Sequence, residues 1–368
     1  MNREARQKTA RGPEPVQRIE LDDSHPVVRL VLVIGLLMLG LLLIGRGIEN
    51  VLTPPSDWTE IEPASAERNC SGDFVFLYNL GQSGMSASSE KKKLTILYSE
   101  ACEKAVGIFS AVGVEELEGG LRQLNLHPNE DRAVEPALYR ALEDVLASGS
   151  RYPYLAPVFE QYGTLFACAS DAEAVNFLPG TNPDLAEYYA EVLPFINDPE
   201  AVRVILNPGG TARLAVSEEY LAYAAKNGIE IFFDFYALKN AFIADYLADS
   251  IREAGFRRGA ISSYDGFVRC FDDSGEGYLL NVYELKDGHA VQTGATEYTG
   301  PMSIAVLRAF PVMEAKEHYW YRFEDGSVIT ALINPVTGRF EPKEDSITRM
   351  DSTESCGLTA LRAYGEIA

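Results

Sequence analysis

The chain has 368 residues, 46% of them hydrophobic, which is enough for one large domain or two ordinary ones. Its formal net charge of −22 argues against nucleic acid as a partner, because phosphate binding needs clustered Lys and Arg. The cysteines and histidines are scattered without zinc-ligand spacing or a disulfide framework. A single disulfide outside the cell stays open, and the sequence does not say which pair would form it.

The N-terminal region predicts a membrane anchor. Residues 1–29 carry six basic and five acidic residues without apolar periodicity, which predicts a disordered cytoplasmic segment. The uncharged run from Leu30 to Gly45 spans roughly 24 Å as a helix, so we expect a transmembrane signal-anchor helix over 30–47. Since most nearby basic residues precede it, the protein is expected to be a single-pass cell-membrane protein with its main domain extracytoplasmic. Residues 48–70, with Pro54, Pro55 and Pro63, predict a tether.

Two alternatives for the apolar run are less favoured. A buried core helix would show a polar stripe, but apolar residues cover every face of this run. A cleaved signal peptide would need a nearby cleavage site, and the small-residue stretch Ala64-Ser65-Ala66 lies too far beyond the run.

Residues 71–368 predict a mixture of helices and strands. Helices are expected over Glu90–Ala111, Glu135–Ala147, Asp184–Leu193, Glu218–Lys226 and Ala237–Glu253. Strands are expected over Asp73–Asn79, Ala201–Leu206, Arg213–Val216, Ile229–Phe235, Arg258–Ser263, 278–285, 302–310 and 318–324. The region 151–182 is aromatic and irregular. This order predicts an α+β fold with one mixed-sheet domain over 71–368, and two closely packed halves are the alternative.

The chemistry visible without a family is limited. No phosphate-binding loop, dinucleotide fingerprint, nucleophile elbow or zinc-protease motif is present. The turn Asn334-Pro-Val-Thr-Gly338 is expected to present backbone N–H groups that suit a phosphate, with a plain surface hairpin as the alternative. Asp245, on a helix, and Asp265, in a turn after a strand, are candidate acids, although an Asp on such a helix is usually a solvated face residue and an Asp-Gly turn is usually only a turn. The stretch Thr293-Gly-Ala-Thr296 resembles the sites at which some extracytoplasmic proteins carry covalent FMN.

Several local patterns over about residues 73–365 resemble the ApbE-type flavin transferases, the bacterial FAD:protein FMN transferases. They are Leu121–Asn125, the helix start Ala237–Asp245, Leu332–Gly338 and the closing segment Thr353–Gly365. The resemblance implies the flavin-transferase fold. It also implies an extracytoplasmic enzyme that binds FAD and Mg²⁺ and passes FMN to a Thr or Ser hydroxyl of a partner redox flavoprotein.

The resemblance also assigns residues. Those expected to contact FAD are Asn125, Lys239, Asn240, Asp245, Asn334, Thr337 and Gly338. The metal ligands would be the backbone carbonyl of Lys239 and the side chains of Ser355 and Thr359. Asp245 and Asp265 are the expected catalytic carboxylates, with Asp265 supplying a carboxylate that the motif lacks.

Four positions depart from the family pattern. Asn240 replaces a Lys, Ala331 a His, Asn334 an Asp, and Ser355 the Asp that ligates the metal. Because Mg²⁺ prefers anionic oxygen ligands, the change at Ser355 removes the only formal charge from the protein ligand set. The alternative function is therefore a catalytically inactive relative that serves as a flavin-binding or protein-binding scaffold.

Overall fold

The computed structural model describes residues 31, 34–36, 38, 40, 58–64, 70–113 and 117–367. The predicted segment 1–29 lies outside these residues, as do most of the predicted transmembrane helix 30–47 and much of the tether 48–70. Within the described ranges, no helix is both long and apolar enough to cross a membrane. From Trp58 onward, the described residues belong to one compact unit.

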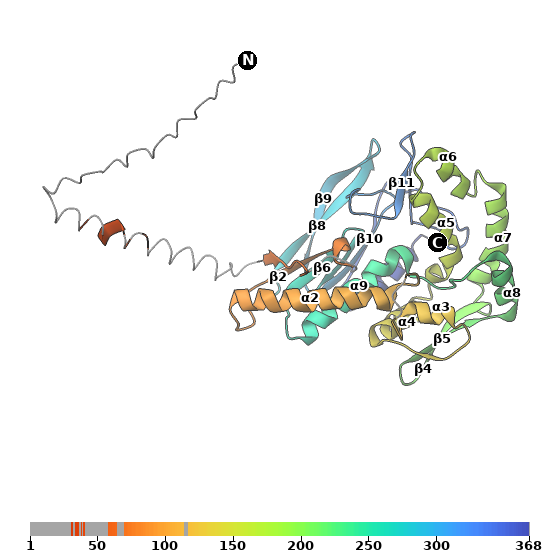
Figure 1. The fold of residues 1–368 in the computed structure, drawn as a ribbon. Helices are drawn as coiled ribbons and strands as arrows, with labels where there is room; N and C mark the ends of the chain where they lie inside the picture. The colour runs from red at the N-terminus through yellow and green to blue at the C-terminus, as the bar shows by residue number, and fades with distance from the viewer. Residues whose placement is uncertain are drawn as a thin grey trace, which may run out of the picture. The chain divides into compact units, whose positions relative to one another are not determined.

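A six-stranded sheet lies at the centre of this unit, in the order β1, β2, β6, β7, β10, β13 (Figure 1). The strands span Trp58–Glu60, Phe74–Asn79, Gly259–Ser263, Phe267–Cys270, Met302–Leu307 and Ile347–Asp351. The α+β class is confirmed. Each neighbouring pair of this sheet is antiparallel, however, where a mixed sheet was expected. One reason is the short turn Tyr264–Gly266, which reverses the chain between β6 and β7.

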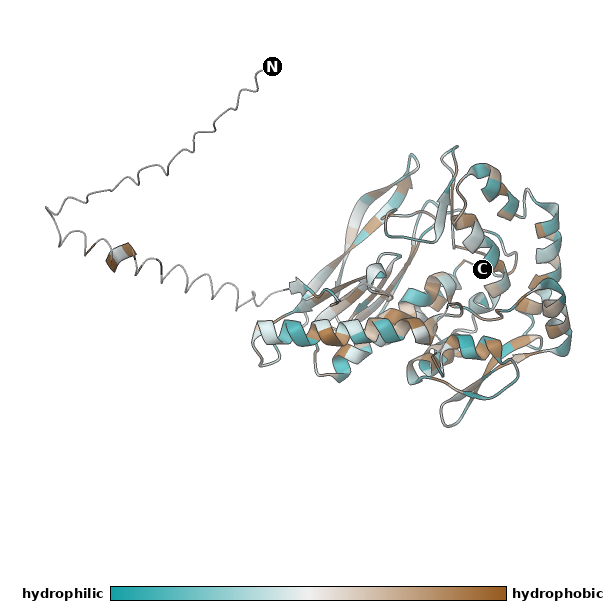
Figure 2. Cartoon of the chain, viewed as in Figure 1, coloured by the Kyte–Doolittle hydropathy of each residue, from teal (hydrophilic) through white to brown (hydrophobic). Residues whose placement is uncertain are grey.

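Three helices pack together beside the sheet: α2 (Ala87–Phe109), α9 (Lys239–Glu253) and α10 (Cys356–Tyr364). α9 contacts β6 and β7, α10 contacts β10, and α2 lies along α9. Hydrophobic and hydrophilic residues alternate along these helices, as amphipathic helices require (Figure 2). Gly357 lets α10 approach α9 closely, because a Cβ atom there would lie 2.4 Å from the ring of Phe242.

A smaller antiparallel sheet, in the order β3, β5, β4, lies among the remaining helices. Its strands span Arg132–Ala133, Thr211–Val216 and Val202–Asn207. The helices are α3 (Leu121–Leu126), α4 (Pro136–Ser148), α5 (Ala156–Phe166), α6 (Asp171–Ala174), α7 (Pro183–Asn197) and α8 (Glu218–Asn227). Short 3-10 turns span Cys70–Asp73 (η1), Tyr152–Leu155 (η2), Val175–Phe177 (η3) and Tyr236–Leu238 (η4). The region 151–182, expected to be irregular, therefore contains two short helices.

The predicted strand Ile229–Phe235 is wrong, because these residues form an irregular buried segment. Phe232, Phe233 and Phe235 are at most 4% exposed, which explains the apolar pattern that resembled a strand. Asn125 of α3 replaces a neighbouring strand as hydrogen-bond partner. Its Oδ1 accepts from the backbone N–H groups of Phe232 and Phe233, and its Nδ2 donates to the Phe233 carbonyl at 2.9 Å.

Two hairpins complete the fold. β8 (Gly277–Lys286) pairs with β9 (His289–Thr299), and β11 (Trp320–Arg322) pairs with β12 (Val328–Thr330). β9 carries the exposed stretch Thr293–Thr296. The predicted strands 302–310 and 318–324 are shorter in the structure, and β7, β9 and β12 are additional strands.

Candidate functional site

A cavity of about 610 Å³ opens at the start of α9, and we call it the aromatic cavity. Its walls include Phe159 and Gly163 of α5, the segment before α9 with Tyr236, Lys239 at the helix start, and Tyr319. The volume lies within the range of about 300–1,000 Å³ that small-molecule sites occupy. The size alone makes this the first candidate for a ligand of nucleotide dimensions.

Aromatic rings define the shape of the aromatic cavity. Phe159 and Tyr236 stack with their ring centroids 4.3 Å apart and their planes at 8°. Tyr236 also meets Tyr319 at 4.8 Å between centroids. Tyr236 has a backbone φ of 47°, a left-handed conformation that is unfavourable for a bulky residue and that is common at binding sites. Phe159 and Tyr236 cover each other's faces and are 2% and 9% exposed, so the cluster offers a planar heterocycle mainly edge-to-face contact.

Among the described residues, the lining of the same cavity holds one cation, Lys239, and three carboxylates, Glu160, Glu230 and Asp234. Tyr319, and then Asp234, raise the pKa of the Lys239 ammonium, against the opposing effect of burial. Burial raises the pKa of the Tyr319 phenol, which therefore stays neutral at neutral pH, so the Asp234 carboxylate is the charge that acts there. Burial also raises the pKa of Asp234 itself. Lys239 thus stays charged and offers an ammonium group to an anion.

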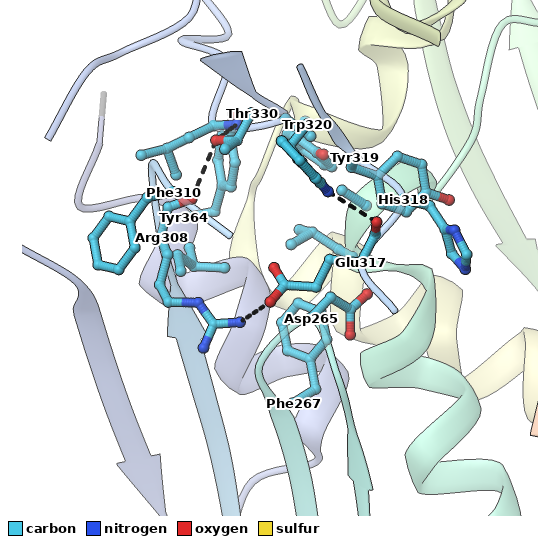
Figure 3. A pocket seen from close by; sticks show the side chains of 16 residues that line it. Asp265, Phe267, Arg308, Phe310, Glu317, His318, Tyr319, Trp320, Thr330 and Tyr364 are labelled. Carbon is cyan, nitrogen blue, oxygen red and sulfur yellow. Dashed lines mark hydrogen bonds and ion pairs between the residues drawn. The ribbon is translucent and has the colours of Figure 1, made fainter. Parts of the chain in front are cut away.

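A second cavity shares Tyr319 with the aromatic cavity, and its volume is only about 60 Å³ (Figure 3). Side chains of Trp320, Tyr364 and Phe310 fill the space around it, and Ala331 is part of its wall. Figure 3 shows Asp265 beside Glu317, whose Oε1 lies 3.3 Å from Nη2 of Arg308. This space is too small for a flavin, but the acidic side chains of Asp265 and Glu317 line it.

Asp265 and Asn240 form a buried pair at this second cavity. Asn240 Nδ2 donates to Asp265 Oδ2 at 2.9 Å, while both Oδ1 atoms are buried without a hydrogen-bond partner. Burial raises the pKa of Asp265 to about 6, although hydrogen bonds from Ser263 and Asn240 oppose the shift. Two of the predicted site residues, Asn240 and Asp265, are therefore in direct contact, and Lys239 precedes Asn240 in the chain.

The start of α10 gathers a different set of predicted residues. Asp245 accepts hydrogen bonds from the backbone N–H groups of Cys356 and Gly357, at 2.9 and 2.8 Å. Burial raises the pKa of Asp245 to about 7, and Arg269, with its Nε 3.4 Å away, opposes the shift. This carboxylate caps the helix and stabilises its positive end. It lines a third cavity of about 220 Å³ together with Ser355.

The side-chain hydroxyls of Ser355 and Thr359 already form hydrogen bonds with neighbouring groups. Ser355 Oγ accepts from the N–H of Leu358 at 3.0 Å and donates to Asp144 at 2.6 Å. The Thr359 side chain is fully buried and donates to the Ser355 carbonyl at 2.8 Å. Lys239 lines the aromatic cavity and Ser355 the third cavity. The three atoms fit Mg²⁺ poorly as a ligand set, because none is a carboxylate and both hydroxyls already have partners.

The turn Asn334–Gly338 satisfies its own donors. Asn334 Oδ1 accepts from the N–H groups of Val336 and Thr337, and the Asn334 carbonyl accepts from Gly338 N–H at 2.8 Å. These groups are therefore not directed at a phosphate. Tyr162 of α5 donates its hydroxyl to the Gly338 carbonyl, which fixes the turn against that helix.

The predicted FAD contacts thus lie in several places. Lys239 lines the aromatic cavity, Asn240 pairs with Asp265 at the second cavity, Asp245 is at α10, and Asn125 holds the buried segment. No pattern in the sequence singles out Phe159, Tyr236 or Tyr319. The one available signal is the density of aromatic residues in 151–182. Elsewhere, aromatic side chains near a helix start are usually interpreted as core residues.

The sequence matches no protein-family model and no curated protein. The fold is that of the ApbE flavin transferases, as solved structures show. The flavin transferase ApbE from Vibrio cholerae matches with a TM-score of 0.54 and 18% identity, over 84% of this chain and 86% of that one. The ApbE protein from Thermotoga maritima matches with a TM-score of 0.55 and 12% identity, over 84% and 87%.

Proposed function

We propose that this chain is a flavin transferase-like protein that binds FAD in the aromatic cavity. The observation that carries the proposal is the cavity itself: about 610 Å³, with stacked aromatic rings and the ammonium of Lys239. The shared fold with flavin transferases makes FAD the ligand to test first. The isoalloxazine ring would lie against the edges of the aromatic cluster, and Lys239 would pair with a phosphate oxygen.

The location is part of the proposal. The predicted span 30–47 would anchor the protein in the cell membrane, with the domain after the tether on the extracytoplasmic side. There it would meet the extracytoplasmic flavoproteins that the resemblance implies as acceptors of FMN. Protease treatment of intact cells tests this: the domain should be degraded from outside, whereas a protected domain would contradict the proposed orientation.

Two activities are compatible with FAD binding. The resemblance implies a transferase that moves FMN to a Thr or Ser hydroxyl with Mg²⁺. The alternative is a flavin-binding scaffold without transfer, and the contacts of Ser355 and Thr359 favour it, since neither contributes a charge to a metal. Asp144, which accepts a hydrogen bond from the Ser355 hydroxyl, is the nearest carboxylate to Ser355.

The experiment uses the full chain in detergent, titrated with FAD with and without Mg²⁺, while flavin fluorescence and AMP release are followed together. We expect FAD to bind. Release of AMP that depends on Mg²⁺ would establish the transferase, and binding without release would establish the flavin-binding scaffold. Failure to bind FAD would refute the proposal.

Two lysine variants make the test specific to the cavity. Lys239→Met should weaken FAD binding by roughly tenfold or more, because a buried charge-assisted contact is lost. Lys226→Met is the matched control, since Lys226 is exposed in the last turn of α8. Equal affinity of the two variants for FAD would place the ligand elsewhere.

A further inference from the structure

Two buried cysteines, Cys70 and Cys102, lie together between η1 and α2. Cys70 is the first residue of η1 and Cys102 lies in α2, and the two elements are in contact. The exposed fractions of the two residues are 7% and 0%. Cys70 Sγ donates to the backbone carbonyl of Cys102 at 3.5 Å, so this thiol is directed at the backbone of the other cysteine.

The surroundings of the pair agree with two neighbouring thiols. A hydrogen bond with the Cys102 thiol, followed by burial, raises the pKa of Cys70 well above its usual value. Tyr98, one turn before Cys102 on α2, is buried next to both cysteines: burial, and then Cys102 and Cys70, raise its pKa. Three groups from two elements therefore share one small buried space.

The other three cysteines have different neighbours. Cys356 Sγ donates to the carbonyls of Ile304 and Val268, and Cys168 Sγ, just after α5, donates to the carbonyl of Thr164 in that helix. Cys270 lies against Gly300, where a Cβ atom would be 2.7 Å from its sulfur. Cys168 therefore lies at the end of α5, while Cys270 in β7 and Cys356, which contacts β7 at Val268, have neighbours other than Cys70 and Cys102.

We propose that Cys70 and Cys102 form a disulfide bond when the protein meets an oxidant, and that the other three cysteines remain thiols. The two residues are 32 positions apart, so the bond would close a long loop and join the start of β2 to α2. Its relevance in the cell rests on the extracytoplasmic location given under the proposed function, because disulfides persist in oxidising compartments. The geometry of the pair does not depend on that location.

The oxidant is a disulfide reagent R–S–S–R, either a small molecule or the disulfide of an oxidoreductase. One cysteine attacks as the thiolate and releases R–SH, which leaves a mixed disulfide on the protein. The second cysteine then displaces the second R–SH. In sum, two thiols lose two protons and two electrons, and the reagent is reduced to two thiols. Because both residues are buried, the exchange requires η1 to open or takes place before folding is complete.

The pair also lies close to the aromatic cavity. Cys70 is among the groups that raise the pKa of Lys239, and Asp73 at the end of η1 is another. A disulfide at Cys70 would therefore restrain η1, the segment whose groups act on Lys239, without involving a residue that lines the cavity.

The test equilibrates the full chain in detergent with mixtures of reduced and oxidised glutathione, blocks free thiols with iodoacetamide under denaturing conditions, and maps peptides by mass spectrometry. The expected product is a peptide pair linked through Cys70 and Cys102, with the other three cysteines alkylated. Alkylation of both Cys70 and Cys102 across the whole range of mixtures would overturn the proposal, as would a link from either one to a third cysteine.

A stability measurement gives a second readout. The oxidised protein should unfold about 5–10 °C above the reduced protein, as a cross-link over a loop of this length predicts. The double variant Cys70→Ser/Cys102→Ser should lose this difference, and Cys270→Ser is the control that should keep it. An unchanged difference in the double variant would contradict the assignment. Thiol trapping in intact cells tests the location separately: a reduced pair in cells that still forms the bond with glutathione supports the pairing and refutes the extracytoplasmic placement.

Discussion

Asn125 shows how a single polar side chain decides a local structure. It is 5% exposed, and both its amide oxygen and its amide nitrogen bind the backbone of the buried segment before α9. A buried backbone group without a partner costs free energy, so this residue permits an apolar segment to stay irregular. The resemblance assigned Asn125 to FAD, and its hydrogen bonds show that it also has a structural role.

Replacing Asn125 with Ala should lower the free energy of unfolding by about 2–4 kcal/mol, because two N–H groups and one carbonyl would be left buried without partners. Chemical denaturation measures the effect. The control is Asn227→Ala, since Asn227 is exposed and donates only to the Tyr223 carbonyl. If both variants lose the same stability, the buried hydrogen bonds of Asn125 do not stabilise the segment.

Asp265 makes a contribution to the free energy of unfolding that depends on pH, and its pKa gives the sign of this dependence. Its pKa in the folded protein is about 6, above the ordinary value of 3.8, so the folded state holds a proton that the unfolded chain releases. This contribution is fully present below about pH 4 and is lost as pH rises through about 6. Asp245, with a pKa of about 7, acts in the same direction.

The variant Asp265→Asn should therefore lose less stability between about pH 4 and pH 6 than the natural protein does. Thermal unfolding over a series of pH values measures this. Asp325→Asn is the control, because the hydrogen bonds of Ser327 lower the pKa of the exposed Asp325 carboxyl and give it the opposite sign. An unchanged slope in Asp265→Asn would mean that Asp265 is ionised in the folded state.

Among the elements, α10 depends most on its cap. The Ser355 hydroxyl accepts a hydrogen bond from one backbone N–H group of the helix start, and the Asp245 carboxylate accepts two more. Arg269 lies next to Asp245. Helix starts leave several N–H groups without partners, and carboxylates near them are favourable. One of these residues, Ser355, is assigned to the metal by the family resemblance, and its role as a cap explains a serine at that position without a ligand.

Replacing Ser355 with Ala should cost about 1–2 kcal/mol, the usual effect of losing an N-cap, and it would also leave Asp144 without its hydroxyl donor. Denaturant unfolding gives the value. Ser170→Ala is a matched control, because Ser170 precedes α6 without a side-chain capping bond. A cost as small as that of the Ser170 control would show that Ser355 does not stabilise α10.

At the scale of the whole molecule, charge is the dominant property. A net charge of −22 makes the chain repel itself at neutral pH, which destabilises a compact state. Salt shortens the range of this repulsion, from about 30 Å in 0.01 M salt to about 3 Å in 1 M salt. The domain should therefore be more stable in salt than in dilute buffer.

We expect the midpoint of thermal unfolding to rise by a few degrees when sodium chloride is raised from about 0.02 to about 0.5 M at neutral pH. The same titration near pH 4.6, the isoelectric point of the sequence, is the control and should show little change. A midpoint that falls with salt at neutral pH would indicate that attractive ion pairs outweigh the repulsion.

Local chemistry allowed the sequence to predict much of this fold. The periodicity of Glu90–Ala111 and Ala237–Glu253 predicted most of α2 and all of α9, since an amphipathic stripe depends only on neighbouring turns. The order of helices and strands predicted the α+β class, and local motifs such as Leu332–Gly338 carried the resemblance to the flavin-transferase fold. The predicted membrane anchor is likewise a property of one continuous stretch, and it stays a prediction.

Only the tertiary structure decided what distant segments do together. The aromatic cavity combines Phe159, Tyr236 and Tyr319, which are far apart in the chain and individually resemble core residues. The buried segment 229–235 could be distinguished from a strand only once Asn125 was seen to bind it, because an apolar run is compatible with both. The contact between Cys70 and Cys102 is likewise decided by the tertiary structure. Spacing in the sequence does not determine which cysteines lie together, whereas the packing of η1 on α2 does.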